Sequence, residues 1–324
     1  MPCTDHFARP ISYLRVSVTD RCNLRCAYCM PVEGVPWRPH DDILTFEEIE
    51  RIVRVAAALG ISKVRLTGGE PLVRAGIVDL VRLLALVPEV DDLAMTTNGT
   101  LLPRHAGALA SAGLDRANIS LDTLRPERFR RITRLGDIRA VLAGIESALD
   151  ANLAPVKLNV VLMAGENDDE IADFVRLTLD RPLHVRFIER MPIGALGPEP
   201  SALVPTDLVM RRIEAEFGRL LPGRPDRGNG PAAYYTLTGA RGTLGFISAM
   251  TDHFCSHCNR LRLTADGNLR PCLMSDTEIA LRPALRSGVS DEELRALILE
   301  AVFAKPEAHG EIAEGERKMS QIGG

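Results

Sequence analysis

The 324-residue sequence lacks a long hydrophobic run, has few aromatic residues and contains no basic block. No apolar stretch approaches the roughly 18 residues that a membrane-spanning helix requires, so we expect no membrane segment. Acidic residues outnumber basic ones by only 43 to 39, which argues against nucleic acid or an anionic membrane as the main partner. The first residues lack the charged-then-apolar pattern of a signal peptide, so we expect a cytoplasmic protein.

Cysteine is also scarce, and six of the seven cysteines fall into two groups of three. The first group is Cys22, Cys26 and Cys29, and the second is Cys255, Cys258 and Cys272. Disulfides do not persist in the cytoplasm, and a closed zinc site would need four ligands. Groups of three therefore predict thiolate ligands that leave one coordination position open. Cys3 stands apart and is given no role.

Each group of three suits an iron–sulfur cluster, because a four-iron cluster has four corners and three cysteines leave one iron open to a small molecule. Zinc is an alternative at both groups. His40 or an acid could complete the first group, and His257, inside the second CxxC, could complete the other. An electron carrier or a zinc-stabilised binding module would be expected to supply four ligands per centre, whereas each centre here has three.

The first part of the chain alternates short β-rich runs with helical stretches. Candidate strands lie at residues 13–18, 63–67, 92–97, 117–121, 156–163 and 184–189. Helices are predicted at 45–60, where Thr45 and Glu48 form a capping box, and at 138–152. Strand, helix, strand in sequence implies a parallel sheet, and about six strands are two short of a closed barrel. We predict an α/β fold, an open and incomplete TIM-like β/α barrel.

The pattern changes near residue 200. A helix at about 206–217 leads into the loop "GRPDRGNGP", and two hairpin-like segments follow at 234–248 and 260–272. A last helix is expected at about 291–303. We predict a barrel region at 1–200 and a smaller α+β extension at 201–324 that carries the second cysteine group.

Several predicted strands carry a cation between apolar residues. These cations are Arg15, Arg65, Lys157, Arg186 and Arg262. Lys63 is two residues from Arg65, and Arg260 is two from Arg262, so each pair shares a strand face. Helices cover the outer face of a barrel strand, which leaves the lumen for these charges.

Unpaired cations in a lumen would be costly, so acids or an anionic ligand must neutralise them. Glu70, Asp122 and Glu189 are the candidate acids. Seven cations against so few acids favour an anion, and the planar fork of arginine suits phosphate. The sequence has no Gly-Lys pair and hence no P-loop, so a bound triphosphate would be held by side chains.

The motif CxxxCxxC, with Tyr28 before its last cysteine, resembles the signature of the radical S-adenosylmethionine (SAM) superfamily. "TGGEP" (67–71) resembles the segment that contacts the methionyl group of SAM. Together with "TTNG", "ISLDTL", "RFIERMPIG", "FCSHCNRLRLTADGNLRPCL" and the terminal "IGG", these motifs resemble the MoaA family of GTP 3′,8-cyclases in molybdenum cofactor biosynthesis. The resemblance runs from about Arg15 to Gly324.

This resemblance implies a role for each matching residue. Cys22, Cys26 and Cys29 would hold a 4Fe–4S cluster that binds SAM, and Tyr28, Gly69, Ser120 and Met191 would contact SAM. Cys255, Cys258 and Cys272 would hold a second 4Fe–4S cluster facing the guanine of GTP. Arg15, Arg65, Thr96, Lys157, Arg260 and Arg262 would bind GTP, with Lys63 and Arg186 joining the phosphate group. Gly323 and Gly324 would reach into the active site.

The reaction implied is the conversion of GTP to (8S)-3′,8-cyclo-7,8-dihydroguanosine 5′-triphosphate, in which a 5′-deoxyadenosyl radical removes the C3′ hydrogen and C3′ then attacks C8. The resemblance also implies a homodimer, a reducing electron donor and cyclic pyranopterin monophosphate synthase as the acceptor of the product. An alternative is a radical SAM enzyme with an auxiliary cluster that modifies a peptide. The strand cations argue against it, since a peptide gives no reason for them.

Overall fold

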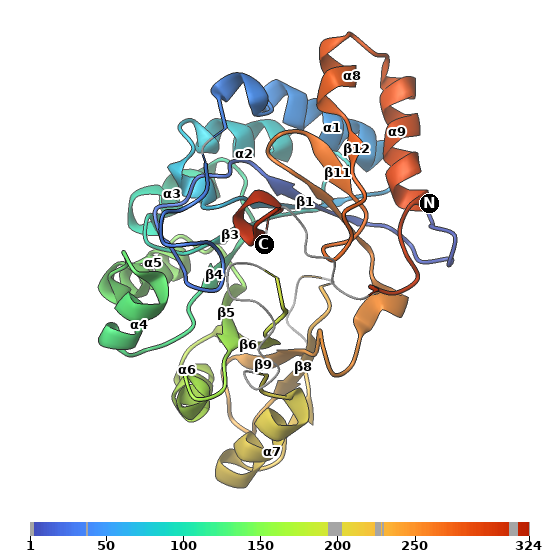
Figure 1. The fold of residues 1–324 in the computed structure, drawn as a ribbon. Helices are drawn as coiled ribbons and strands as arrows, with labels where there is room; N and C mark the ends of the chain where they lie inside the picture. The colour runs from blue at the N-terminus through green and yellow to red at the C-terminus, as the bar shows by residue number, and fades with distance from the viewer. Residues whose placement is uncertain are drawn as a thin grey trace.

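The computed structural model describes residues 3–36, 38–193, 203–223, 228, 230–310 and 317–323. Within these ranges the strands form one twelve-stranded sheet in the order β12-β11-β10-β1-β2-β3-β4-β5-β6-β9-β8-β7. Figure 1 shows the sheet curved around an open interior, with helices outside it and the C-terminal turn of the chain on the inner side. The site described below lies on that inner side.

The six strands expected in the first part of the chain are all present. They are β1 (Tyr13–Ser17), β2 (Lys63–Thr67), β3 (Asp92–Thr97), β4 (Arg116–Ser120), β5 (Val156–Leu162) and β6 (Leu183–Glu189). Each pairs in parallel with the next. The prediction of an open, parallel β/α barrel is confirmed.

The strands of the C-terminal region extend both edges of this sheet. On one side β9 (Thr243–Ile247) pairs in parallel with β6, and β8 (Ala233–Thr236) and β7 (Leu221–Pro222) follow in antiparallel order. On the other side β10 (Arg260–Leu263) pairs in parallel with β1, followed by antiparallel β11 (Asn268–Arg270) and β12 (Ile279–Ala280). Both predicted hairpins are therefore present. The boundary near residue 200 falls outside the described residues and stays a prediction.

Helices cover the outer face of the sheet (Figure 1). They are α1 (Phe46–Ala58), α2 (Ile77–Ala85), α3 (Leu102–Ser111), α4 (Pro126–Thr133), α5 (Ile138–Asp150), α6 (Ile171–Asp180), α7 (Thr206–Phe217), α8 (Arg282–Arg286) and α9 (Asp291–Phe303). The predicted capping box closes α1, because Thr45 Oγ1 accepts from the Glu48 N–H and the Glu48 carboxylate accepts from the Thr45 N–H. Ile49, Ile52 and Val53 of that helix are fully buried.

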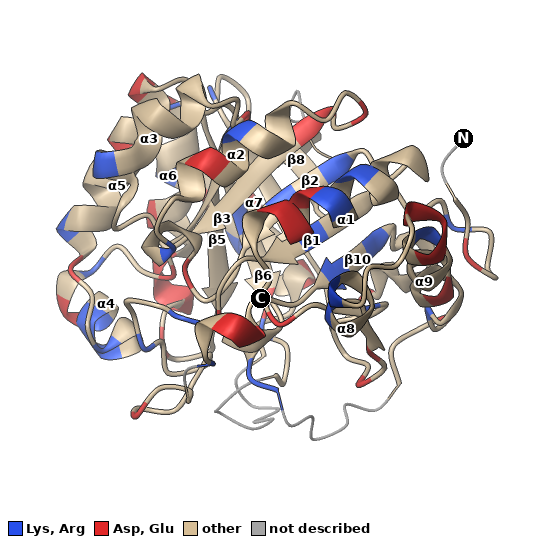
Figure 2. Ribbon diagram, turned by 90° about the horizontal axis from the view of Figure 1, so that it is seen from above, with Lys and Arg blue, Asp and Glu red and all other residues tan. Residues whose placement is uncertain are grey.

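Charges of both signs are interspersed over the outer helices, as Figure 2 shows. This distribution agrees with the near balance of acids and bases in the sequence. No helix in the described part of the chain combines the length and apolar character that a bilayer-spanning segment needs.

The close approach of α5 to the loop after β3 allows the packing to be tested. Gly144 of α5 lies so close to the loop after β3 that an added Cβ would meet the Gly99 carbonyl oxygen at 2.2 Å. Gly144→Ala should lower the free energy of unfolding by about 1–3 kcal/mol through overpacking. Gly107→Ala, in α3 with open space around it, should raise that free energy by about 0.5–1 kcal/mol. Urea denaturation of cluster-free protein measures both, and equal effects would contradict the packing described.

Candidate active site

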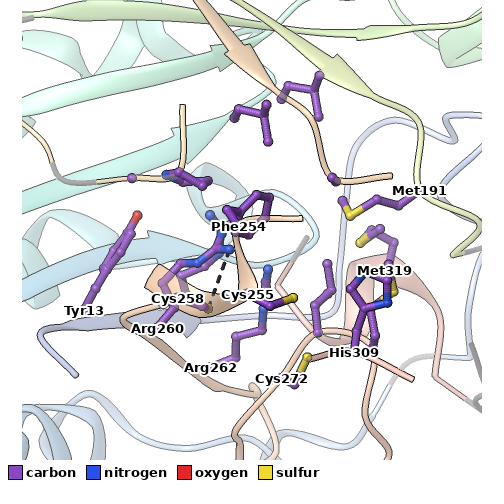
Figure 3. Close-up of a pocket in the computed structure, with 18 of the residues that line it drawn as sticks. Tyr13, Met191, Phe254, Cys255, Cys258, Arg260, Arg262, Cys272, His309 and Met319 are labelled. Carbon is purple, nitrogen blue, oxygen red and sulfur yellow. Dashed lines mark hydrogen bonds between the residues drawn. The ribbon is translucent and has the colours of Figure 1, made fainter. Parts of the chain in front are cut away.

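A cavity of about 250 Å³ opens on the inner side of the sheet. Six of the residues predicted to bind a nucleotide line it, namely Arg15, Arg65, Thr96, Arg186, Arg260 and Arg262. Three residues predicted to contact SAM, Tyr28, Ser120 and Met191, line it as well, and so do Cys255, Cys258 and Cys272. Figure 3 shows the three cysteines gathered in this pocket beside Arg260 and Arg262.

Three arginines form a row across neighbouring strands. Arg15 of β1 is in register with Arg262 of β10 on one side and with Arg65 of β2 on the other. In-register residues of a parallel sheet project to the same face, which here is the inner face that lines the cavity. The row joins the two ends of the sequence, because β10 comes from the C-terminal region.

The acids that could have neutralised these cations are occupied elsewhere. Glu70 accepts hydrogen bonds from Thr97 and Asn98, Asp122 from Tyr28 and Val161, and Glu189 from Thr206 and Thr251. Burial raises the pKa of the Glu70 carboxyl to about 7 and that of Asp122 to about 6. Within the described ranges, no acidic side chain forms an ion pair with Arg65, Arg186 or Arg262.

Burial and the neighbouring positive charges lower the pKa values of two of these cations. Burial, together with the charges of Arg116 and Arg186, lowers the pKa of Arg65 to about 9. The same two causes lower the pKa of Lys157 to about 6, and this side chain is only 2% exposed. Such an array is unfavourable by itself and would be stabilised by an anion with several negative charges.

Two of the predicted nucleotide ligands lie outside the cavity lining. Lys63, at the start of β2, pairs with Asp91 at 3.6 Å. Lys157 lies behind Gly228, whose added Cβ would meet Lys157 Nζ at 3.0 Å. Arg116, which the sequence analysis did not single out, forms an ion pair with Asp92 at 2.7 Å, so its positive charge is neutralised within the protein.

The first cysteine group follows β1 and is anchored by the loops after β2 and β3. The N–H of Gly69 donates to the Thr19 carbonyl (2.7 Å) and that of Glu70 to the Arg21 carbonyl (2.8 Å). A Cβ on Gly69 would lie 2.3 Å from the Arg21 oxygen, so only glycine fits. In the described structure Gly69 therefore supports the loop into Cys22 and does not line the cavity.

The chemistry of the donors fits thiolate coordination at the first group. The three thiols are close enough that their charges influence one another, and burial raises the pKa of Cys22 to about 11 and that of Cys29 to about 12. These thiols therefore need a positively charged metal centre to ionise at neutral pH. Within the described residues no three His, Cys, Asp or Glu side chains surround one common ion position, and in a 4Fe–4S cluster each thiolate binds an iron of its own.

The second group has a different electrostatic setting. Burial would raise the pKa of Cys258, but the charges of Arg260 and Lys305 outweigh it and lower the pKa to about 6. Arg260 Nη2 lies 3.9 Å from Cys258 Sγ, the contact dashed in Figure 3. His257 is exposed and hydrogen bonds to Ser256, so it does not turn toward the cysteines as a zinc ligand.

The C-terminal tail reaches the first cysteine group and the arginine row. The Gly323 carbonyl accepts from Arg15 (3.1 Å) and Arg262 (2.8 Å), and the Ser320 N–H hydrogen bonds the Cys29 thiol. Arg317 fixes this tail through Asp266, with both contacts at 3.0 Å. The other predicted tail residue, Gly324, lies outside the described residues.

Several lining residues were missed by the sequence reasoning. Tyr13 and Asn159 stand two positions from Arg15 and Lys157 on the same strands, so the period of two could have found them. His253 and His309, whose ring nitrogens lie 2.9 Å apart, and Lys305 come from loops and carry no periodic signal.

Two family models match the chain: residues 16–178 match the Radical SAM superfamily, and residues 183–311 match Molybdenum Cofactor Synthesis C. Among solved structures, Streptococcus suis SuiB bound to S-adenosylmethionine is similar, with a TM-score of 0.57 at 15% identity. The match covers 84% of this chain and 63% of that one, and it shows the shared fold.

Curated relatives match over the full length. The GTP 3′,8-cyclase of Heliobacterium modesticaldum is 58% identical, and that of Pelotomaculum thermopropionicum is 55% identical, each over 99% of both chains. The chain belongs to the GTP 3′,8-cyclase family. The predicted resemblance to this family of radical SAM enzymes is confirmed, and SAM and an iron–sulfur cluster follow as cofactors from the superfamily match.

The lowered pKa of Lys157 predicts that the binding of an anion at this site is coupled to the uptake of a proton. At pH 8 the side chain is neutral in the free protein, because its pKa is about 6. A bound polyanion should raise that pKa, so binding of inorganic tripolyphosphate should take up about one proton between about pH 6 and the raised pKa, and little outside that range. Calorimetry in two buffers of different ionisation enthalpy measures this uptake.

Lys157→Met gives the matched baseline, since it retains only the protonation of the anion itself. Lys63→Met, which removes a lysine paired with Asp91, should leave the uptake unchanged. Equal proton uptake by the wild-type protein and by Lys157→Met would contradict the assignment of the extra proton to Lys157.

Proposed function

We propose that this protein is a lyase that converts GTP to (8S)-3′,8-cyclo-7,8-dihydroguanosine 5′-triphosphate in molybdenum cofactor biosynthesis. The observation that carries the proposal is the pocket in which Arg15, Arg65 and Arg262, from both ends of the sequence, meet the second cysteine group. Full-length identity of 58% to a protein named GTP 3′,8-cyclase supports it.

In this proposal the cations bind the triphosphate, and the second cysteine group faces the guanine. Anchoring the nucleotide at both ends fixes the ribose between them. Ring closure within one molecule depends on such positioning, where a displacement of about 1 Å costs on the order of a hundredfold in rate. The arginine row suits this task because it is built on adjacent strands of one rigid sheet.

We propose two 4Fe–4S clusters. Cys22, Cys26 and Cys29 hold the one that binds SAM, with Tyr28, Gly69, Ser120 and Met191 near the cofactor. Cys255, Cys258 and Cys272 hold the other. When bound, the first cluster and SAM supply the radical chemistry. The protein orients the cofactor, and the hydrogen bond from Tyr28 to Asp122 (2.7 Å) fixes the tyrosine ring at the edge of the pocket.

The remaining parts of the proposal rest on the family resemblance. The protein acts in the cytoplasm as a homodimer and receives electrons from a reducing donor. Its product passes to cyclic pyranopterin monophosphate synthase. Gly323 and Gly324 belong to the active site, a role supported by the contacts of the Gly323 carbonyl with Arg15 and Arg262.

An anaerobic reaction tests the function. Protein reconstituted with iron and sulfide is mixed with SAM, GTP and a strong reductant, and products are followed by mass spectrometry. We expect 5′-deoxyadenosine and the cyclic nucleotide to form together, with other nucleotides unable to replace GTP. Formation of 5′-deoxyadenosine while GTP stays intact would support the SAM site but would contradict GTP as the substrate. A peptide would then be the leading candidate for the substrate.

The two arginines of β10 that line the cavity generate a second test. Arg262→Ala and Arg260→Ala should each weaken GTP binding roughly ten- to a hundredfold, the equivalent of one charge-assisted hydrogen bond of about 1.5–3 kcal/mol. SAM cleavage should persist, because neither side chain belongs to the first cysteine group. Titration calorimetry measures the affinity, with Arg82→Ala on the exposed side of α2 as the control. Unchanged GTP affinity in both variants would refute the assignment.

A further inference from the structure

Two buried cations that are not among the predicted nucleotide ligands contact the backbone of the second cysteine group. The first is Lys305, only 4% exposed, whose Nζ donates to the carbonyls of Arg260 (2.9 Å) and Pro271 (2.8 Å). Pro271 immediately precedes Cys272, and Arg260 follows Cys258 by two residues. One ammonium group therefore ties together the backbones that carry two of the three thiols.

The second cation is Arg9, which holds the remaining cysteine. Its guanidinium donates to the carbonyl of Cys255 itself (2.7 Å) and to the carbonyls of Pro306 (2.6 Å) and Glu307 (2.8 Å). Asp5, buried with it, pairs with Arg9 Nε at 2.6 Å. Arg9 thus joins Cys255 to the segment that contains Lys305, and we name Arg9 and Lys305 together the carbonyl clamp.

The two cations of the clamp differ in their charge balance. Arg9 is neutralised by Asp5. Lys305 forms no ion pair with an acid in the described part of the chain, and its ammonium hydrogen bonds the Cys258 thiol. A buried ammonium without a counter-charge is costly, and a centre bearing three thiolates would supply that charge.

We propose that Arg9 and Lys305 are positioning residues for the second iron–sulfur cluster: the clamp fixes the three cysteine backbones, and the charge of Lys305 favours the reduced cluster. This inference rests on the proposed function, which supplies the cluster. Partners outside the first coordination sphere typically change metal affinity by about 10–100-fold. Charge and hydrogen bonds at the sulfurs are known determinants of cluster potential.

The test isolates the second cluster in a parent protein with Cys22→Ala, Cys26→Ala and Cys29→Ala. In this parent, Lys305→Met should lose iron to a chelator about tenfold faster and shift the midpoint potential to a more negative value. The double variant Arg9→Met/Asp5→Asn removes the buried pair without changing the net charge, so it should lose iron faster but keep the potential. Electron paramagnetic resonance during a redox titration measures the potential, a readout that a purely structural role would not move.

Arg134 provides the matched control, since it makes the same kind of contact at the first group. Its Nη1 donates to the carbonyls of Arg25 (3.1 Å) and Met30 (3.0 Å), which flank Cys26 and Cys29. Arg134→Met should leave the second cluster unchanged in the parent described. In the reciprocal parent, with Cys255→Ala, Cys258→Ala and Cys272→Ala, Arg134→Met should labilise the first cluster and Lys305→Met should not.

Folding is checked by circular dichroism of each variant. A folded Lys305→Met with the iron-loss rate and potential of the parent overturns the clamp. If Lys305→Met does not fold, Lys305→Gln, which keeps a donor without the charge, replaces it, and an unchanged potential there overturns the charge effect. A parent that takes up no iron overturns the second cluster and the clamp together. If the variants behave as expected for the clamp but the wild-type protein does not convert GTP in the anaerobic reaction, the proposed function alone is refuted.

Discussion

The parallel pairing of β1 with β10 is the contact on which the rest of the site depends. It brings a strand from residue 260 onward against a strand that begins at residue 13. This pairing places Arg262 beside Arg15, sets the second cysteine group at the inner face, and gives the C-terminal tail its two arginine partners. Without it, the second cysteine group would not meet Arg15 and Arg65 in one pocket.

The cost of removing charged groups from water explains why the buried carboxylates and the buried cations of the interior have different partners. The buried carboxylates at the carboxyl ends of strands bind the backbone: Glu70, Asp122 and Glu189 each accept a hydrogen bond from a backbone N–H of a neighbouring segment. Most of the predicted nucleotide-binding cations line the cavity. Burial, together with the charges of neighbouring arginines, lowers the pKa values of Arg65 and Lys157. A sheet that concentrates unbalanced positive charge at one place is stable only because the rest of its core is apolar, and it is prepared for an anion.

Much of the fold was readable in the sequence because it is local. The six barrel strands, the capping box of α1 and both hairpins follow from periodicity and from the chemistry of single turns. The sequence did not show to which edges of the sheet β9 and β10 attach. Pairing between strands about 60 residues apart, as for β6 and β9, or almost 250 residues apart, as for β1 and β10, leaves no periodic trace. For the same reason the sequence showed which cations are present but not that Lys63 pairs with Asp91 or that Arg9 reaches Cys255.

The same long-range pairing has a kinetic consequence. One edge of β1 has no partner until the chain has been made as far as β10, about 245 residues later. At about 5–20 residues per second, synthesis leaves the backbone N–H and C=O groups of this strand edge unpaired for roughly 12–50 s. Sheets that depend on distant strands fold slowly, and open edges pair readily with other chains. The nascent protein therefore passes through a stage with an open strand edge, favourable to aggregation, whose length is set by the rate of translation.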